Sequence, residues 1–287
     1  MSEQNLPLDT TFELGETITP EQTAFLDTWG FLHFRGVAKP EEVETLLSEM
    51  KRIEELFYDE KRKKVNGVPI FYGRNLDGNP LAQRLPFTST FSPFIRNFVR
   101  DDRFEPIRLL FDGDARVGDE EKDGVVMNQY INIPGSIYRR LGWHNDALRD
   151  VFYGRVPDRM LNVGLHLDQI TEADGGLRLI PGTQNIGLFK MAFGKAHFVW
   201  HRRNKNEIVV ETQPGDLTVH DGRMWHRVAR SSQKGAPSLR RTMYVPYVTG
   251  PYEPKNEKSK TAGYHHLGAF SRFMRNAIPR KKRPVSP

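Results

Sequence analysis

The segment Gly142-Trp143-His144-Asn145-Asp146 carries an imidazole and a carboxylate two positions apart. On a β-strand, residues i and i+2 leave the same face, so His144 and Asp146 can bind one metal ion together. A third ligand must come from elsewhere, and the strongest candidate is His226 at the end of the segment 214–226. Two imidazoles and one carboxylate on one face of an octahedral metal leave three coordination positions open, as in non-haem Fe(II) oxygenases.

A second histidine, His220, is a rival for the third ligand because it lies six residues before His226. His197 and His201 are four residues apart, a spacing at which two side chains share one face of a helix. They stand in a basic insertion, residues 195–205, and we expect both to be solvated. Residue types alone therefore leave the choice between His220 and His226 open.

The composition narrows the kind of metal site and the kind of partner. The 287 residues include no cysteine, which excludes thiolate ligands and a disulfide framework. The first residues lack the apolar stretch of a signal peptide, and no apolar run reaches the length of a membrane span. We therefore expect a cytoplasmic protein without a membrane partner. The net charge is +6, concentrated in a tail at 279–284 that is interpreted as a solvated terminus rather than a nucleic-acid contact.

Helical patterns dominate before residue 120, and strand patterns dominate after it. Thr19 is a suitable N-cap for a helix that Gly30 ends, a second helix is predicted over 39–56 and a third over 92–111. Residues 61–93 are predicted to be a loop with short strands. Segments typical of strands lie at 31–37, 125–133, 161–167, 177–180, 207–212 and 239–248. This order favours an α+β domain, mainly β, built on a sandwich or barrel.

Several motifs follow one another in a characteristic order. They are Pro134-Gly135-Ser136 before the His-X-Asp motif at His144, a Gly-rich segment at 171–183, Pro214-Gly215-Asp216 before His226, and Arg240-Arg241 within one strand of that histidine. Together they resemble the phytanoyl-CoA dioxygenase group of Fe(II)/2-oxoglutarate oxygenases. The helix at 19–29 and the Gly-Phe-Leu after it resemble the N-terminal segment of the same family. The resemblance covers residues 18–250.

The resemblance implies a double-stranded β-helix, a jelly roll of the cupin type, with N-terminal helices packed on the major sheet. It also implies Fe(II), the cosubstrate 2-oxoglutarate and O2, with release of succinate and CO2. The sequence Asp221–Trp225 matches the family's lead-in to its distal ligand, which favours His226 over His220. His144, Asp146 and His226 are then the expected metal-binding and catalytic residues.

On this basis we divide the chain into an N-terminal arm, residues 1–17, an oxygenase domain, residues 18–250, and a basic C-terminal extension, residues 251–287. Within the domain, 18–120 is predicted to be helical support and 121–250 the β-helix core. The sequence departs from the family at Gln184, where a histidine is usual, and at Val228, where relatives often place a serine near the cosubstrate. The loop between His226 and Arg240 is also longer than in several relatives.

Two adjacent arginines compete for the distal carboxylate of 2-oxoglutarate, whose geometry suits the fork of a guanidinium. Arg240 and Arg241 leave opposite faces of a strand, so only one can point inward. Apolar residues at 243, 245 and 247 would by themselves favour Arg241. We predict Arg240, because helices cover the major sheet in this fold and make its outer face apolar too. The family's Arg-X-small pattern also matches Arg240-Arg241-Thr242.

The remaining candidates come from strand faces near the motifs, where ordinary strand or core roles are the alternative for each residue. Those expected to contact the cosubstrate are Asn132 and Thr242, and those expected to contact the substrate are Asn128, Tyr130, Trp143 and His166.

The predicted function is oxidation of a small metabolite by hydroxylation, desaturation, ring closure or epoxidation. Halogenation is not expected, because halogenating relatives replace the carboxylate ligand by a small residue and here Asp146 is present. An anionic or zwitterionic substrate is expected from the net charge and from the arginines near the motifs, Arg139, Arg140, Arg149 and Arg178. The alternatives are a cupin-type metal-binding protein or isomerase that uses no oxoacid, and a basic scaffold that acts through its tail.

Overall fold

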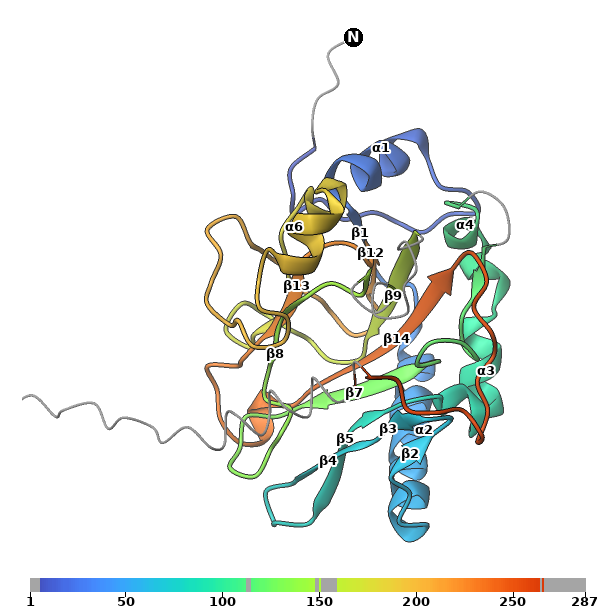
Figure 1. The fold of residues 1–287 in the computed structure, drawn as a ribbon, viewed down its shortest axis with the longest axis vertical. Coiled ribbons are helices and arrows are strands. Elements are labelled where there is room, and N and C mark those ends of the chain that lie inside the picture. Colours follow the sequence, from blue (N-terminus) through green and yellow to red (C-terminus); the bar gives the residue numbers. More distant parts are fainter. Residues whose placement is uncertain (1–5, 112–114, 148–149, 151–158, 264, 266–287) are drawn as a thin grey trace, which may run out of the picture.

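Two antiparallel sheets face each other and form the centre of the fold (Figure 1). The computed structural model describes residues 6–111, 115–147, 150, 159–263 and 265. Within these residues, the larger sheet has eight strands in the order β1-β12-β9-β14-β7-β5-β4, with β6 paired to β14. The smaller sheet has four strands in the order β11-β10-β13-β8. The expectation of a jelly roll with supporting helices is confirmed.

The described helices are α1 (Pro20–Trp29), α2 (Pro40–Asp59), α3 (Pro93–Val99), α4 (Glu105–Arg108) and α6 (Leu188–Phe193). The strands of the first half are β1 (Phe31–Phe34), β2 (Lys64–Val65), β3 (Val68–Pro69), β4 (Phe71–Arg74), β5 (Pro80–Leu85) and β6 (Arg116–Val117). Those of the second half are β7 (Val126–Tyr130), β8 (Leu141–His144), β9 (Met160–His166), β10 (Gly176–Leu179), β11 (Ile208–Val209), β12 (Leu217–Asp221), β13 (His226–Ala229) and β14 (Arg240–Val248). No helix in the described ranges is both long enough and apolar enough to cross a membrane.

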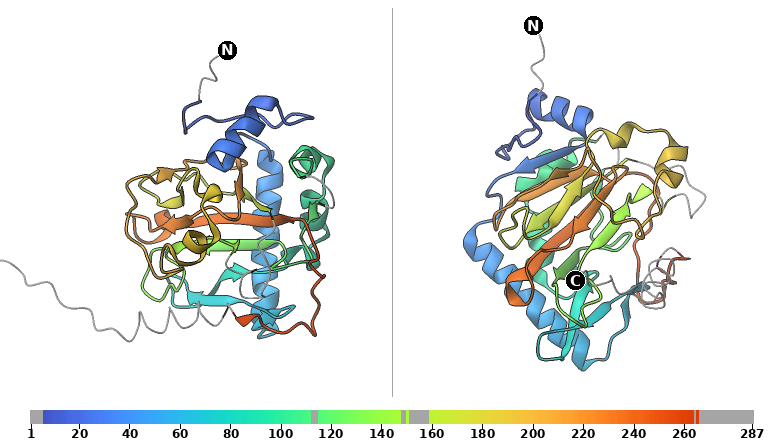
Figure 2. Two further views of the ribbon diagram at one scale, coloured as in Figure 1. Left: turned by 45° about the horizontal axis from the view of Figure 1, so that its top comes forward. Right: turned by 90° about the vertical axis from the view of Figure 1, so that its left-hand side faces the viewer.

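Helices α2 and α3 cover the outer face of the larger sheet, while α1 lies at its end beside β1 (Figure 2). The sequence explains the ends of α1, because Thr19 and Gln22 form a capping box and Gly30 adopts a left-handed conformation. The apolar stripe of α2 and the outer strand residues share one core, which includes Val43, Leu46, Met50, Ile53, Val163, Leu165, Met243 and Val245. Each such side chain stabilises the fold by about 1.5–3 kcal/mol on burial.

This apolar outer face determines which strand residues point inward. In β14, Met243 and Val245 belong to the outer core, so Arg240, Thr242 and Tyr244 face the smaller sheet. The neighbouring strands β9 and β12 alternate in the same way. The inner face of the larger sheet is therefore polar where its outer face is apolar.

Some predicted elements have different bounds. The helical pattern at 92–111 is split into α3 and α4, because Arg100 leaves the helical conformation and Asp101 caps the turn that follows. The strand expected at 207–212 is reduced to β11. Strands β1 and β5 join the larger sheet by pairing with β12 and β7, so the first 120 residues supply more than helices. The division of the domain at residue 120 stays a prediction.

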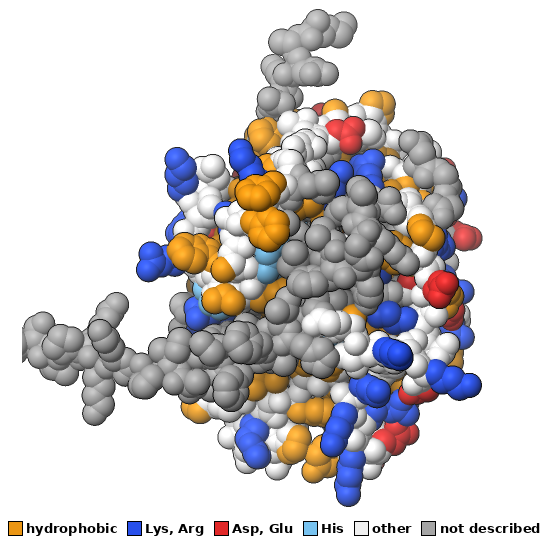
Figure 3. Space-filling model, viewed as in Figure 1, with side chains coloured by type: hydrophobic (Ala, Val, Ile, Leu, Met, Phe, Trp, Pro, Cys, Tyr) orange, Lys and Arg blue, Asp and Glu red, His pale blue; other side chains and the backbone are white. Residues whose placement is uncertain are grey.

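The insertion at 195–205 forms no helix, and the expectation that its histidines are solvated was wrong. His197 and His201 are half-buried, and the His197 ring lies 4.6 Å from the ring of Trp225. Just before it, hydrophobic side chains are exposed over α6 (Figure 3), and the exposed hydrophobic residues of this helix include Phe189 and Phe193. The insertion packs along β8, since the Trp143 amide donates to the Trp200 carbonyl.

Candidate active site

His144 and His226 are direct cross-strand partners in the smaller sheet, at the end of β8 and the start of β13. Asp146 follows two residues after β8, and its backbone amide donates to the Gly222 carbonyl at 2.7 Å. One ligand atom from each of the three side chains can be chosen so that all lie within 4.8 Å of one another. Residues separated by 80 positions in the chain therefore converge on one point.

Both imidazoles are oriented by backbone carbonyls two residues earlier. His144 Nδ1 lies 2.8 Å from the Gly142 oxygen, and His226 Nδ1 lies 3.0 Å from the Met224 oxygen. A carbonyl only accepts hydrogen bonds, so Nδ1 carries the proton and the Nε2 lone pair is left for a metal. Burial lowers the pKa of His144 to about 3, helped by the neighbouring His226, so the imidazole is neutral at physiological pH. This donor set fits Fe(II), which accepts imidazole and carboxylate ligands without thiolate.

His220 lies beside this group with a different set of contacts. Its ring centroid is 4.7 Å from that of His226, and its Nε2 is 3.2 Å from the Asn162 amide nitrogen. The same amide nitrogen is 2.5 Å from Asp146 Oδ2. These contacts support His226 as the third ligand. His220 is connected to the ligand Asp146 through Asn162.

A cavity of about 140 Å³ opens beside the three ligands. Asn128 and Tyr130, which we expected to contact the substrate, line this cavity from β7. The Asn128 carboxamide oxygen is buried and has no hydrogen-bond partner among the described residues. Two predicted substrate contacts therefore lie where a substrate beside the metal would reach them.

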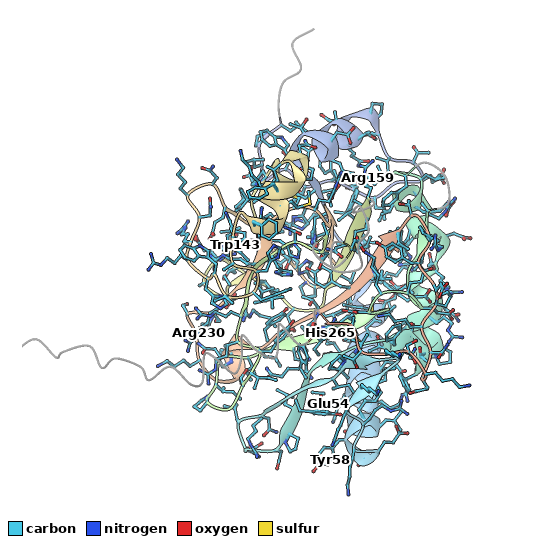
Figure 4. The ribbon with its side chains drawn as sticks, in the orientation of Figure 1. Glu54, Tyr58, Trp143, Arg159, Arg230 and His265 are labelled. Carbon is cyan, nitrogen blue, oxygen red and sulfur yellow. The ribbon has the colours of Figure 1, made fainter. Side chains whose placement is uncertain are left out.

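Trp143, which is labelled in Figure 4, does not line this cavity and belongs to a small apolar cluster with Ile180 and Trp225. It is fully buried, and its indole nitrogen donates to the Arg202 carbonyl at 2.9 Å. Its neighbour His144 takes the inward position, as strand alternation requires. The structure thus gives Trp143 a core position instead of a substrate contact.

A second, narrower cavity adjoins the first, because Tyr130, Leu177, Val228 and Tyr244 line both. Arg240, Thr242 and His166 line this second cavity. Each has a buried polar atom without a hydrogen-bond partner in the described part of the chain: Arg240 Nε, Thr242 Oγ1 and His166 Nδ1. Leaving such an atom without a hydrogen bond costs about 1–3 kcal/mol of free energy. These three atoms together therefore indicate a binding position for a polar ligand.

Arg240 is held rigidly in this second cavity. Its terminal nitrogens donate to the Ala229 carbonyl at 2.7 Å and the Arg139 carbonyl at 3.1 Å, and its guanidinium lies over the Tyr130 ring. Burial lowers the pKa of Arg240 to about 10, which leaves it charged at neutral pH. Arg241 lies on the opposite face and pairs with Asp168. The geometry supports the predicted choice of Arg240.

Asn132 lies outside both cavities. Its amide nitrogen donates to the Ser231 and Gln233 carbonyls, and its oxygen accepts from Arg230 Nε. It holds the loop that follows β13 and does not line the Arg240 cavity. His166, expected at the substrate, lines the Arg240 cavity instead.

Three of the four arginines on which the expected substrate charge rested, Arg139, Arg140 and Arg178, do not line the larger cavity. Arg178 is buried and donates to the Glu172 carbonyl, and Arg149 lies outside the described residues. The charged pair in the cavity wall is Arg84 with Asp123, 2.6 Å apart, which sequence patterns missed. These residues come from β5 and from the loop before β7, and only the three-dimensional fold brings them to the site.

Metal-free protein is expected to lose stability in acid partly through His166. Burial lowers the pKa of this imidazole to about 3, against about 6.5 in an unfolded chain. Between these values the unfolded chain binds the proton preferentially, so stability falls as pH falls, by up to about 1.4 kcal/mol per pH unit. The free energy of unfolding of the metal-free protein, measured in urea between pH 6.5 and 4.5, should fall less steeply with decreasing pH in His166→Gln than in the wild type. An unchanged slope would exclude this contribution.

Comparisons with known proteins agree with this geometry. A family model of phytanoyl-CoA dioxygenase (PhyH) matches residues 26–235, more than two thirds of the chain. Among curated proteins, nothing matches.

Solved structures with similar folds include HygX from Streptomyces hygroscopicus with nickel and 2-oxoglutarate bound, at 19% identity, covering 80% of this chain and 86% of that chain with a TM-score of 0.56. AviO1 from Streptomyces viridochromogenes Tue57 is 18% identical over 81% of this chain and 96% of its own, with a TM-score of 0.56. The non-haem α-ketoglutarate-dependent carbocyclase SnoK from nogalamycin biosynthesis is 14% identical over 90% and 93%, with a TM-score of 0.61. At these identities the likeness shows a shared fold. The family match goes further: the chain belongs to the phytanoyl-CoA dioxygenase family.

Proposed function

We propose that this protein is an Fe(II)- and 2-oxoglutarate-dependent dioxygenase that oxidises a small-molecule metabolite. His144, Asp146 and His226 hold the iron, and Arg240 holds the distal carboxylate of 2-oxoglutarate. The observation that carries the proposal is the junction of the two cavities, where an open three-donor metal site adjoins a pocket with a buried guanidinium and unsatisfied polar atoms. A reaction in the cytoplasm is part of the same proposal.

The protein contributes binding and orientation to this reaction. When bound, Fe(II) and 2-oxoglutarate supply the oxidising chemistry, with release of succinate and CO2. The Gly142 and Met224 carbonyls fix the imidazole tautomers, and Asp146 supplies the anionic donor. Arg240 and Thr242 would hold a carboxylate of the cosubstrate in the second cavity. Leu177 and Val228 line both cavities and add apolar surface where the two cavities adjoin.

The lining of the larger cavity suits a small substrate that carries both apolar and polar groups. Its wall contains Leu141, Met160 and Tyr138 beside the amide of Asn128 and the Arg84–Asp123 pair. A zwitterionic substrate fits this pair, because Arg84 and Asp123 present both charge signs to the cavity. Hydroxylation, desaturation, ring closure and epoxidation share one kind of metal site, and Asp146 argues against halogenation.

Anaerobic titration of the metal-free protein with Fe(II) and 2-oxoglutarate tests the proposal. A visible metal-to-ligand charge-transfer band that needs both components is the expected result. A cupin-type protein or isomerase would bind metal without this band, and a basic scaffold would need neither component. Iron binding without any response to 2-oxoglutarate would overturn the proposed function.

A further inference from the structure

Asn162 and His220 lie side by side on the inner face of the larger sheet. They are direct register partners between β9 and β12, and both line the larger cavity beside the metal ligands. The Asn162 amide nitrogen lies 2.5 Å from Asp146 Oδ2 and 3.2 Å from His220 Nε2. One amide therefore connects the carboxylate ligand on one sheet to a histidine on the other.

The chemistry of these groups fixes the direction of each hydrogen bond. A carboxylate at neutral pH only accepts, so the Asn162 group next to Asp146 must be the NH2 and not the carbonyl oxygen. The second hydrogen of that NH2 is directed to His220 Nε2, which must then accept. The His220 proton is therefore on Nδ1. With its two hydrogens directed to fixed acceptors, the Asn162 amide has one favoured orientation.

We propose that Asn162 and His220 are positioning residues for the ligand Asp146. The two histidine ligands are each oriented by a backbone carbonyl, but Asp146 stands after the end of β8 and its side chain is about one fifth exposed. Asn162 fixes the rotation of that carboxylate, and His220 fixes Asn162 in turn. This inference rests on the proposed metal site and extends it to two residues that bind no metal themselves.

The arrangement also explains why His220 is not a fourth ligand. Its Nε2 lone pair is used by Asn162, and its Nδ1 carries the proton, so no nitrogen of this ring is available to a metal. His220 Nδ1 is buried and has no hydrogen-bond partner among the described residues. Because its ring lines the larger cavity, this N–H is a donor that a bound molecule with an oxygen acceptor could use.

The test measures Co(II) binding to the metal-free full-length protein, by chelator competition and by the visible ligand-field spectrum. Asn162→Ala should weaken Co(II) binding about 10–100-fold and change the spectrum, the effect expected when the partner of a ligand is lost. His220→Gln places an acceptor near the position of Nε2 and should stay close to the wild-type affinity. His220→Asn cannot reach that position and should weaken binding. Gln184→Ala, which removes a buried carboxamide bonded to the Asp27 and Thr28 carbonyls, is the matched control.

Unchanged Co(II) affinity and spectrum in Asn162→Ala would overturn the inference, as would equal affinities in His220→Gln and His220→Asn. Should Asn162→Ala not fold, side-chain 15N chemical shifts of the wild-type protein loaded with Zn(II) decide, because they identify the tautomer. An Nε2–H tautomer at His220 would contradict the inference. These readouts need no 2-oxoglutarate, so failure of the proposed reaction with an intact Asn162 effect is distinguishable from failure of the positioning role.

Discussion

His144→Ala, Asp146→Ala and His226→Ala are each expected to abolish iron binding and 2-oxoglutarate turnover. Loss of one of three protein ligands leaves two donors on an open site, which is a larger defect than the about 10–100-fold loss caused by removing a ligand's partner. The loss of metal binding is expected without a loss of the fold, because β8 and β13 pair through their backbones and this pairing does not depend on the side chain of His144 or His226. Iron content after anaerobic reconstitution, the charge-transfer band and succinate release measure the three consequences.

His220→Gln provides the matched comparison for His226→Ala. The two rings lie 4.7 Å apart and both are buried, but only His226 belongs to the group of three side chains whose ligand atoms lie within 4.8 Å of one another. His220→Gln should therefore keep iron and the charge-transfer band, while His226→Ala loses both. Full activity in His226→Ala together with loss of iron in His220→Gln would show that the third ligand had been assigned to the wrong histidine.

The residues of the candidate metal site could be predicted from the sequence because they obey local rules. The i, i+2 spacing of His144 and Asp146 suits one face of a strand, and strand alternation separated Arg240 from Arg241 once the outer face was taken to be apolar. Both arguments need only the geometry of a single strand. The distal ligand, His226, needed the family order of motifs as well, because no local rule links it to His144.

The residues that line the cavities could not be predicted from the sequence in this way. Arg84 and Asp123 meet because β5 pairs with β7 in the larger sheet, and no periodic pattern in the sequence predicts that pairing. Asn132 was misplaced because it lies two residues beyond the last residue of β7, where strand alternation no longer decides the direction of a side chain. His166 was placed on the correct face, but which of two adjoining cavities it lines depends on the packing of the whole sheet.

Arg240→Gln is expected to raise the Michaelis constant for 2-oxoglutarate about 30-fold or more, with little change for Arg241→Gln. Truncating one partner of a buried, hydrogen-bonded charge pair costs about 2–5 kcal/mol, and each 1.4 kcal/mol corresponds to a factor of ten. Arg240 meets the conditions for such a cost, because it is about 1% exposed and points into a cavity where Thr242 and His166 also have unsatisfied atoms. The Michaelis constant from succinate release at varied 2-oxoglutarate is the measurement.

Arg241 differs from Arg240 in every property that matters for this prediction. Its guanidinium pairs with Asp168 at 2.5 Å on the outer face of the sheet, and more than a quarter of its side chain is exposed. Removing such an ion pair costs at most about 1 kcal/mol of stability and leaves the cavity unchanged. Arg240→Lys separates charge from shape, since lysine keeps the positive charge but loses the fork that matches a carboxylate. A large rise of the Michaelis constant in Arg241→Gln, with Arg240→Gln near normal, would reverse the assignment and with it the inward direction of Thr242 and Tyr244.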